Sequence, residues 1–334
     1  MKPQVASLKA QGSGLKAQGL RNNCMRYRFF RRAGIVMLTL ATASTGFAQA
    51  RGQNPGQGQQ GQGRGGGQGR GGAPPPPAKA APRYPDGQIN LGLVEGEPRG
   101  LWEVGATNVP LARPDNAKDF GLFAADVREP ADPFLASKPR LSQIPFQPWA
   151  RALFANRVQI RNEPYVRCKP SSAMRQVATA YGTQFVDDRE LKRFYIFETG
   201  GAHSFRTIYM DGRAHPPNLP PSYRGHSVGH WEGDTLVVDT VGFNEKVWID
   251  NLGLPTTDQL HTIERLTRTD FNTIKYEITV DDPGAYTAPW KSGNYLRWQS
   301  EAESFEFVCQ DNNQAPNLIV GDGTDVIVTP VYIP

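Results

Sequence analysis

The chain has 334 residues and a formal net charge of +5, with 37 Lys and Arg against 32 Asp and Glu. Residues 1–50 contain eight of these basic residues and residues 51–82 contain four, and neither segment contains an acid. Removing these twelve leaves 25 basic against 32 acidic residues in 83–334, a balance of −7. Because phosphate backbones require a basic footprint, this balance excludes nucleic acid as an expected partner.

The first 50 residues have the pattern of a secretory signal. Four arginines lie between positions 26 and 32, an apolar run covers 33–45, and residues 48–50 have the A-x-A form of a cleavage site. Met25 is the expected true start, because a signal counted from there has a length within the usual range of about 15–30 residues. No later run reaches the ~18 consecutive apolar residues of a membrane span. The sequence therefore predicts a periplasmic or secreted protein without a transmembrane segment.

Two segments of unusual composition follow the signal. Residues 51–82 are rich in Gly and Gln and then in Pro, a composition that buries no core and predicts a disordered linker. Residues 83–147 are rich in Pro and Gly with few periodic stretches, which predicts an extended arm packed on the domain. Residues 148–334 are then the expected folded domain.

Periodicity in this domain predicts one short helix followed by strands. Trp149, Leu153 and Phe154 are spaced to share one face of a helix at 148–154. After about Thr183, alternating patterns and turn signals indicate β-structure. The candidate strands are 183–188, 192–198, 204–211, 226–232, 235–243, 261–269, 274–281, 294–299 and 303–309. The fold class is mainly all-β, an antiparallel lipocalin-like β-barrel or a sandwich, and a succession of hairpins favours the barrel.

The cysteines are interpreted together with export. Cys24 would leave with the signal, so Cys168 and Cys309 remain as an even pair in an oxidising compartment. A disulfide between them is the leading interpretation, and two buried free thiols are the alternative. Neither cysteine has a C-x-x-C neighbour, which disfavours a metal site or a catalytic thiol.

All five histidines lie within residues 203–261. Since histidine has the unperturbed pKa closest to neutral pH and is the commonest metal ligand, any chemistry is expected in this window. Its sharpest local feature is a hairpin with a two-residue type II′ turn that begins at Gly233. In this register His226, His230 and Asp239 share one face, with Asp239 diagonal to both histidines.

The functional interpretation of this face is a carboxylate that orients an imidazole. Asp239 would hold His226 as a general base or acid, with His261 as a third catalytic candidate. The alternative is a buried polar pair or a solvated face of the sheet. A zinc site is disfavoured, because His226 and His230 on one strand would be about 13 Å apart. The sequence therefore predicts neither a metal nor a cofactor.

Three residues are candidates for substrate binding. Arg206 lies among apolar neighbours on its strand face, where an arginine is costly unless it pairs with a carboxylate of the protein or of a ligand. Tyr209 and Trp248 belong to a set of aromatic residues that could stack on a sugar or a lipid, although such residues more often lie in the core or at its rim. His215, directly before two prolines, is expected to be a loop residue without a role in the site.

Several of these residues fall in segments that resemble a known group of proteins. The segments are FRTIYMDGR at 205–213, GHSVG at 225–229 and WEGDTLVVDT at 231–240. They are similar to a large family of uncharacterised secreted bacterial proteins, and the likeness spans roughly residues 148–313. The resemblance implies export and β architecture but no activity. The chain departs from the family pattern at His203 and His230.

Three functions remain open at this point. The first is an acid–base enzyme acting on a small organic or carbohydrate substrate, with His226 as base, Asp239 as its orienting carboxylate, and His261 and Arg206 in contact with the substrate. The second is a lipocalin-like protein that binds an apolar small molecule, and the third is a structural envelope protein. A lumen lined by the histidine face favours the enzyme, a lumen lined by Trp and Leu favours the carrier, and a filled interior favours the structural role.

Overall fold

The structure is a computed structural model that describes residues 78–104, 110–120, 127–160, 163–179, 181–200 and 205–309. The chain divides into two compact units, residues 1–72 and residues 73–334, and every described residue belongs to the second. The predicted signal, most of the predicted linker and His203 lie outside the described residues. No helix in these described ranges is both long and apolar enough to cross a membrane.

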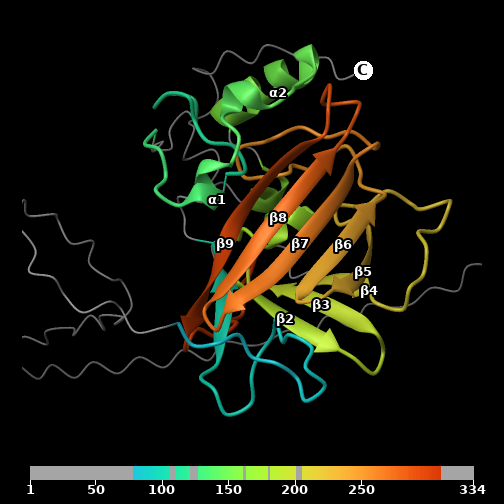
Figure 1. Cartoon of the computed structure of the whole chain (residues 1–334). Coiled ribbons are helices and arrows are strands. Elements are labelled where there is room, and N and C mark those ends of the chain that lie inside the picture. Colours follow the sequence, from blue (N-terminus) through green and yellow to red (C-terminus); the bar gives the residue numbers. More distant parts are fainter. Residues whose placement is uncertain are drawn as a thin grey trace, which may run out of the picture. The chain divides into compact units, whose positions relative to one another are not determined.

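Nine strands in the described part of the chain close into one β-barrel (Figure 1). They are β1 (Gly100–Glu103), β2 (Thr183–Asp188), β3 (Arg193–Glu198), β4 (Phe205–Tyr209), β5 (His226–Glu232), β6 (Thr235–Val241), β7 (His261–Asp270), β8 (Thr273–Asp281) and β9 (Trp290–Ser300). Each strand pairs with the next one along the chain, and β9 closes the barrel against β1. This architecture confirms the all-β prediction and selects the barrel over the sandwich.

Two strand assignments differ from the prediction. The predicted strand at 303–309 is wrong, because this segment has no regular secondary structure. Strand β1 lies instead within the predicted arm, where Trp102 pairs opposite Trp298 and donates its indole N–H to the carbonyl of Leu91 at 2.9 Å. Gly100 permits this pairing, since a Cβ there would lie 2.5 Å from the ring of Trp298 and from a backbone carbonyl oxygen.

One pairing interrupts the succession of hairpins. β4 and β5 run parallel and are paired only at Ile208 with Ser227 and at Tyr209 with Val228. A parallel pair cannot be joined by a two-residue turn, so the chain needs a longer connection. Residues 210–225 provide it as a yellow loop that projects from the barrel in Figure 1. The regular hairpin order on which the lipocalin-like expectation rested is therefore broken at this point.

The interior of the barrel is packed with side chains. The largest fully buried residues that alternation directs inward are Trp102, Phe185, Phe194, Ile196, Arg206 and Tyr276. Full burial of a large apolar side chain contributes roughly 1.5–3 kcal/mol relative to its exposure to water. Arg206 is the charged member of this set.

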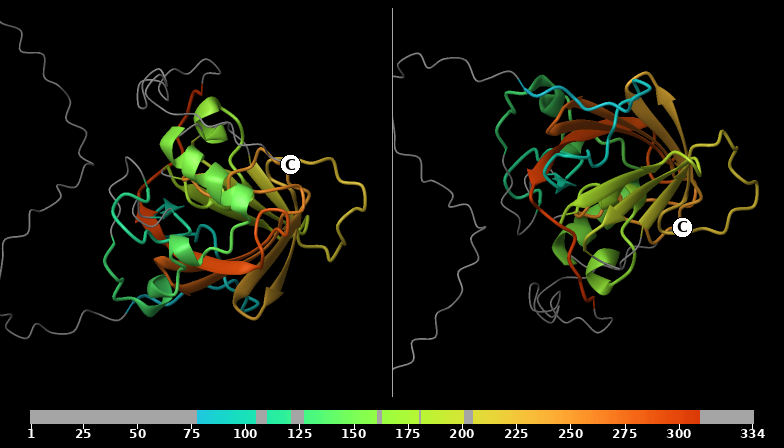
Figure 2. Two further views of the ribbon diagram at one scale, coloured as in Figure 1. Left: turned by 90° about the horizontal axis from the view of Figure 1, so that it is seen from above. Right: turned by 90° about the horizontal axis from the view of Figure 1, so that it is seen from below.

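Helices flank the strands of the barrel (Figure 2). They are α1 (Pro133–Ala136), α2 (Pro148–Ile160), α3 (Ala173–Gln176) and the 3-10 helices η2 (Leu141–Gln143) and η3 (Pro164–Arg167). The helix predicted at 148–154 is confirmed and is longer than expected. Trp149 of α2 donates its indole N–H to the carbonyl of Gly284 at 3.0 Å, and the Arg157 guanidinium lies 4.8 Å from the ring centroid of Trp248.

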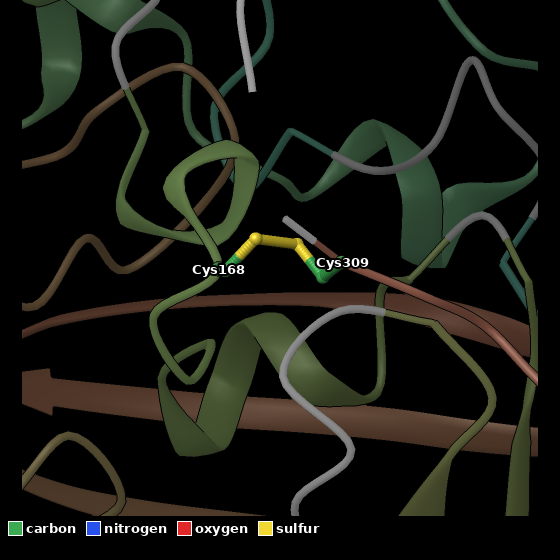
Figure 3. Close-up of a disulfide and its surroundings, with 2 residues drawn as sticks. All are labelled: Cys168 and Cys309. Carbon is green, nitrogen blue, oxygen red and sulfur yellow. A yellow bond between two sulfur atoms is a disulfide. The ribbon is translucent and has the colours of Figure 1, made fainter. Parts of the chain in front are cut away.

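The predicted disulfide between Cys168 and Cys309 is confirmed (Figure 3). The two Cα atoms are 5.6 Å apart, and 141 positions of sequence separate the residues. Cys168 directly follows η3 and has a φ of +57°. The bond therefore fastens the segment after β9 to the segment that precedes β2.

Candidate functional site

The hairpin of β5 and β6 has the predicted register. Gly233 has a φ of +58°, as the first central position of a type II′ turn requires. Val228 lies opposite Asp239, and His226 lies opposite Val241. His226 and Asp239 therefore project from the same face of the hairpin, on neighbouring strands.

This face is the outer face of the barrel. The chain neighbours Ser227, Val238 and Thr240 are buried and point inward, whereas His226 and Asp239 are half-buried. The polar face of the hairpin thus does not line a lumen. It lies on the outside of the barrel wall, and one residue of the 210–225 loop reaches it.

Four side chains on this outer face form a hydrogen-bonded group, which we name the histidine cluster: His215, His226, Asp239 and His261. His226 Nδ1 is 2.8 Å from His215 Nδ1, and His215 Nε2 is 3.2 Å from Asp239 Oδ1. His261 Nε2 is 2.8 Å from the same Asp239 oxygen. The contacts therefore run from His226 through His215 to Asp239, and His261 approaches the carboxylate from β7.

The hydrogen bonds determine the tautomers in the neutral cluster. A carboxylate only accepts, so His215 and His261 each donate an Nε2–H to Asp239. His215 Nδ1 then has no proton and accepts a hydrogen bond. His226 must therefore donate its Nδ1–H to it. In this tautomer the Nε2 of His226 is unprotonated. Its lone pair can then accept a proton from a substrate.

Tyr209 and Arg213 extend the cluster on the side of β4. The Tyr209 ring stacks on His226 with centroids 5.0 Å apart, and the Arg213 guanidinium lies 4.1 Å from the Tyr209 centroid. Burial lowers the pKa of His226, and electrostatic interactions with His215 and Arg213 lower it further. Hydrogen bonds from Arg213 and then Arg193 hold the pKa of the Asp211 carboxyl well below its usual range. His226 is therefore expected to be neutral at neutral pH.

Arg206 lies on the other side of the barrel wall from this cluster. Its Nη1 donates to Glu264 at 3.1 Å, its Nε to Ser227 at 2.9 Å and its Nη2 to Thr240 at 2.8 Å. The Tyr276 hydroxyl also donates to Glu264, at 2.9 Å. The carboxylate expected for Arg206 is thus a buried group of the protein itself, and the guanidinium does not reach the histidine cluster.

The other residues of the histidine window have separate environments. Trp248 is buried against α2, away from the outer face of β5 and β6. His230 is exposed and bonds Glu232 at 3.2 Å, without a contact to Asp239 among the described interactions. Of the predicted site residues, the structure brings together His226, Asp239, His261 and Tyr209, and it places Arg206 and Trp248 elsewhere.

His215 is the cluster member that the sequence pattern does not predict. It does lie in a loop, as expected, but its two ring nitrogens connect His226 to Asp239. The parallel pairing of β4 with β5 requires the connection to return to the start of β5, which is where His226 lies. A sequence pattern that predicted this parallel pairing would also have placed His215 near His226.

Comparison of the chain with protein-family models, with curated proteins and with solved structures finds no match. In the part of the chain that the structure describes, no three His, Cys, Asp or Glu side chains are arranged to hold a metal ion. The geometry of the histidine cluster is therefore the basis for a functional proposal.

Proposed function

We propose that the chain is an exported acid–base enzyme whose active site is the histidine cluster on the outer face of the barrel. The observation that carries this proposal is the chain of hydrogen bonds from Asp239 through His215 to His226. The disulfide supports export, because such bonds form and persist in oxidising compartments. The signal-like start and the resemblance to secreted bacterial proteins favour the same location.

In this proposal His226 Nε2 is the general base. When it takes a proton from the substrate, its Nδ1–H remains bonded to His215, and the positive charge is stabilised by the carboxylate of Asp239 beyond it. His215 and Asp239 are positioning residues. His261 shares the Asp239 oxygen and is the candidate general acid, since an imidazolium there pairs with the same carboxylate. A well-placed acid or base contributes typically 10²–10⁴-fold to a rate.

The two other functions have less support. An apolar ligand inside the barrel would compete with Trp102, Phe185 and Phe194, which already fill the interior. A structural role agrees with the filled interior, but it does not account for a half-exposed cluster in which three imidazoles are connected to one carboxylate. A group of mutually bonded titratable side chains that includes one with a perturbed pKa, as His226 has, is a candidate for acid–base chemistry. The substrate in this proposal is a small organic molecule or a carbohydrate.

The test is a turnover screen of the full chain. Pools of soluble oligosaccharides and organic acids are incubated with the wild type and with His226→Gln, and products are identified by mass spectrometry. We expect a product whose formation falls at least about 10²-fold in His226→Gln. His230→Gln is the matched control, because His230 lies on the same strand and face but outside the cluster.

Three outcomes would overturn the proposal. The first is a product formed equally by the wild type and by His226→Gln. The second is turnover that a chelator abolishes and added zinc restores, because the proposed base needs no metal. A screen without any product, combined with an ordinary histidine pKa for His226, would also contradict it.

A further inference from the structure

The outer faces of β2, β3 and β4 form a regular set of nine side chains, which we name the aromatic grid. Read across the three strands, its rows are Gln184–Phe197–Phe205, Val186–Tyr195–Thr207 and Asp188–Arg193–Tyr209. The intervening residues of β3 and β4 are buried, so alternation directs the grid outward. The third row contains Tyr209, the residue that stacks on His226.

Three rings of the grid form one contiguous surface, in which Phe197 and Phe205 are exposed and Tyr195 is half-buried. The centroids of Phe197 and Phe205 are 5.6 Å apart, and each lies 6.0 Å from the centroid of Tyr195. Phe197 is 38% exposed and Phe205 is 55% exposed. Single exposed apolar residues are ordinary on a protein surface, whereas a contiguous group of them marks an interaction site.

The grid leads to the histidine cluster. Phe205, Thr207 and Tyr209 follow one another on the outer face of β4, and the rise of a strand makes this row about 13 Å long. At its end the Tyr209 ring contacts His226. An elongated ligand that lies on the exposed rings would therefore extend along β4 to the proposed base.

The charge of the grid indicates what kind of ligand it fits. Its nine residues include one acid, Asp188, and one base, Arg193, so the surface is neutral. An anionic membrane or a nucleic acid would require a cluster of lysines and arginines, which the grid lacks. Gln184 and Thr207 supply neutral hydrogen-bonding groups next to the rings. A sugar chain has the matching chemistry. Its apolar C–H faces can stack on the aromatic rings, and its hydroxyls can bond the amide of Gln184 and the hydroxyl of Thr207.

We infer that the aromatic grid binds a neutral carbohydrate chain and directs it to the histidine cluster. This inference rests on the proposed function and assigns its substrate class, a neutral polysaccharide or long oligosaccharide. Tyr195, Phe197 and Phe205 would be binding residues that stack on sugar rings. Tyr209 would contact the unit of the chain that reaches His226.

The test is affinity electrophoresis of the full chain in gels that contain a soluble neutral β-glucan, a soluble mannan or acidic polygalacturonate. We expect one of the two neutral polysaccharides to retard the wild type. Phe197→Ala and Phe205→Ala should each raise the dissociation constant about tenfold, which corresponds to the loss of one stacked ring. Phe205→Tyr should restore binding, because it keeps the ring. Leu191→Ala is the matched control, since Leu191 is 62% exposed and lies in the turn between β2 and β3.

Three results would overturn the inference. They are unretarded migration of a folded wild type in both neutral gels, retention by vesicles of anionic lipid instead, and a dimer in sedimentation that Phe197→Ala abolishes. Failure of this inference is distinguishable from failure of the proposed function. The grid variants leave His226 in place, so turnover of a short substrate and the pKa of His226 report on the cluster independently of polysaccharide binding.

Discussion

Replacement of Arg206 by Met tests whether the interior of the barrel is dry and packed. Arg206 is 2% exposed, and Glu264 is fully buried. Arg206→Met removes the charged partner of the Glu264 carboxylate, and the donor that remains to it among the described residues is the Tyr276 hydroxyl. Ser227 and Thr240 lose less, because their hydroxyls are 3.0 Å apart and can still bond each other. Breaking a buried ion pair in this way costs about 3–5 kcal/mol.

Urea unfolding at pH 7, followed by tryptophan fluorescence, measures this loss. A loss of this size is a large part of the 5–15 kcal/mol typical of a domain, so the midpoint should fall clearly while the slope stays constant. The double variant Arg206→Met/Glu264→Leu should be more stable than Arg206→Met alone, because it leaves no unpaired buried charge. A cost below about 1 kcal/mol for Arg206→Met would refute the reasoning. Lost turnover at unchanged stability would instead favour a substrate contact for Arg206.

Local geometry sets three more expected outcomes. Cys168→Ser/Cys309→Ser should lower the free energy of unfolding by up to about 5 kcal/mol in the chain-entropy estimate, and equal urea midpoints would contradict it. In NMR titrations His226 should have a pKa below about 6.5, so its contribution to stability is full above that pH and is lost as the pH falls through the lowered pKa. A titration midpoint for His226 at or above pH 6.5 would contradict the lowered pKa. Gly225→Ala should cost more than Gly212→Ala in thermal unfolding, because both have positive φ but a Cβ at Gly225 would lie 2.6 Å from a backbone carbonyl oxygen. Equal costs would show that this contact relaxes.

The strands that were predictable are those whose local pattern agrees with the pairing. Alternation and the turn at Gly233 determine the register of β5 and β6 without any distant information. Strand β1 was hidden, because it has four residues in a Pro- and Gly-rich segment and exists through its pairing with β9, which is almost 200 positions away. The segment 303–309 alternates like a strand, but Phe305 and Phe307 instead pack on Tyr181. Its alternation therefore serves side-chain packing rather than a backbone ladder.

The site divides in the same way. His226 and Asp239 come together through the register of one hairpin, which the sequence specifies locally. His215 joins them through the path of the 210–225 loop, and that path depends on a parallel pairing of only two residue pairs. Arg206 shows the same limit, because its partner Glu264 is 58 positions away and periodicity cannot choose between a carboxylate of the protein and one of a ligand.

The inner network and the outer cluster are two faces of the same four strands. Inside, Arg206, Ser227, Thr240 and Glu264 come one each from β4, β5, β6 and β7, and their side chains are bonded to one another. Outside, Tyr209, His226, Asp239 and His261 come one each from the same strands. Ser227 directly follows His226, and Thr240 directly follows Asp239, so each inner bond fixes the backbone that carries an outer group. The parallel pairing of β4 with β5, which consists of two residue pairs, lies at this place. The buried guanidinium thus fixes the geometry of the proposed active site without contacting it, which is how a supporting network positions catalytic groups.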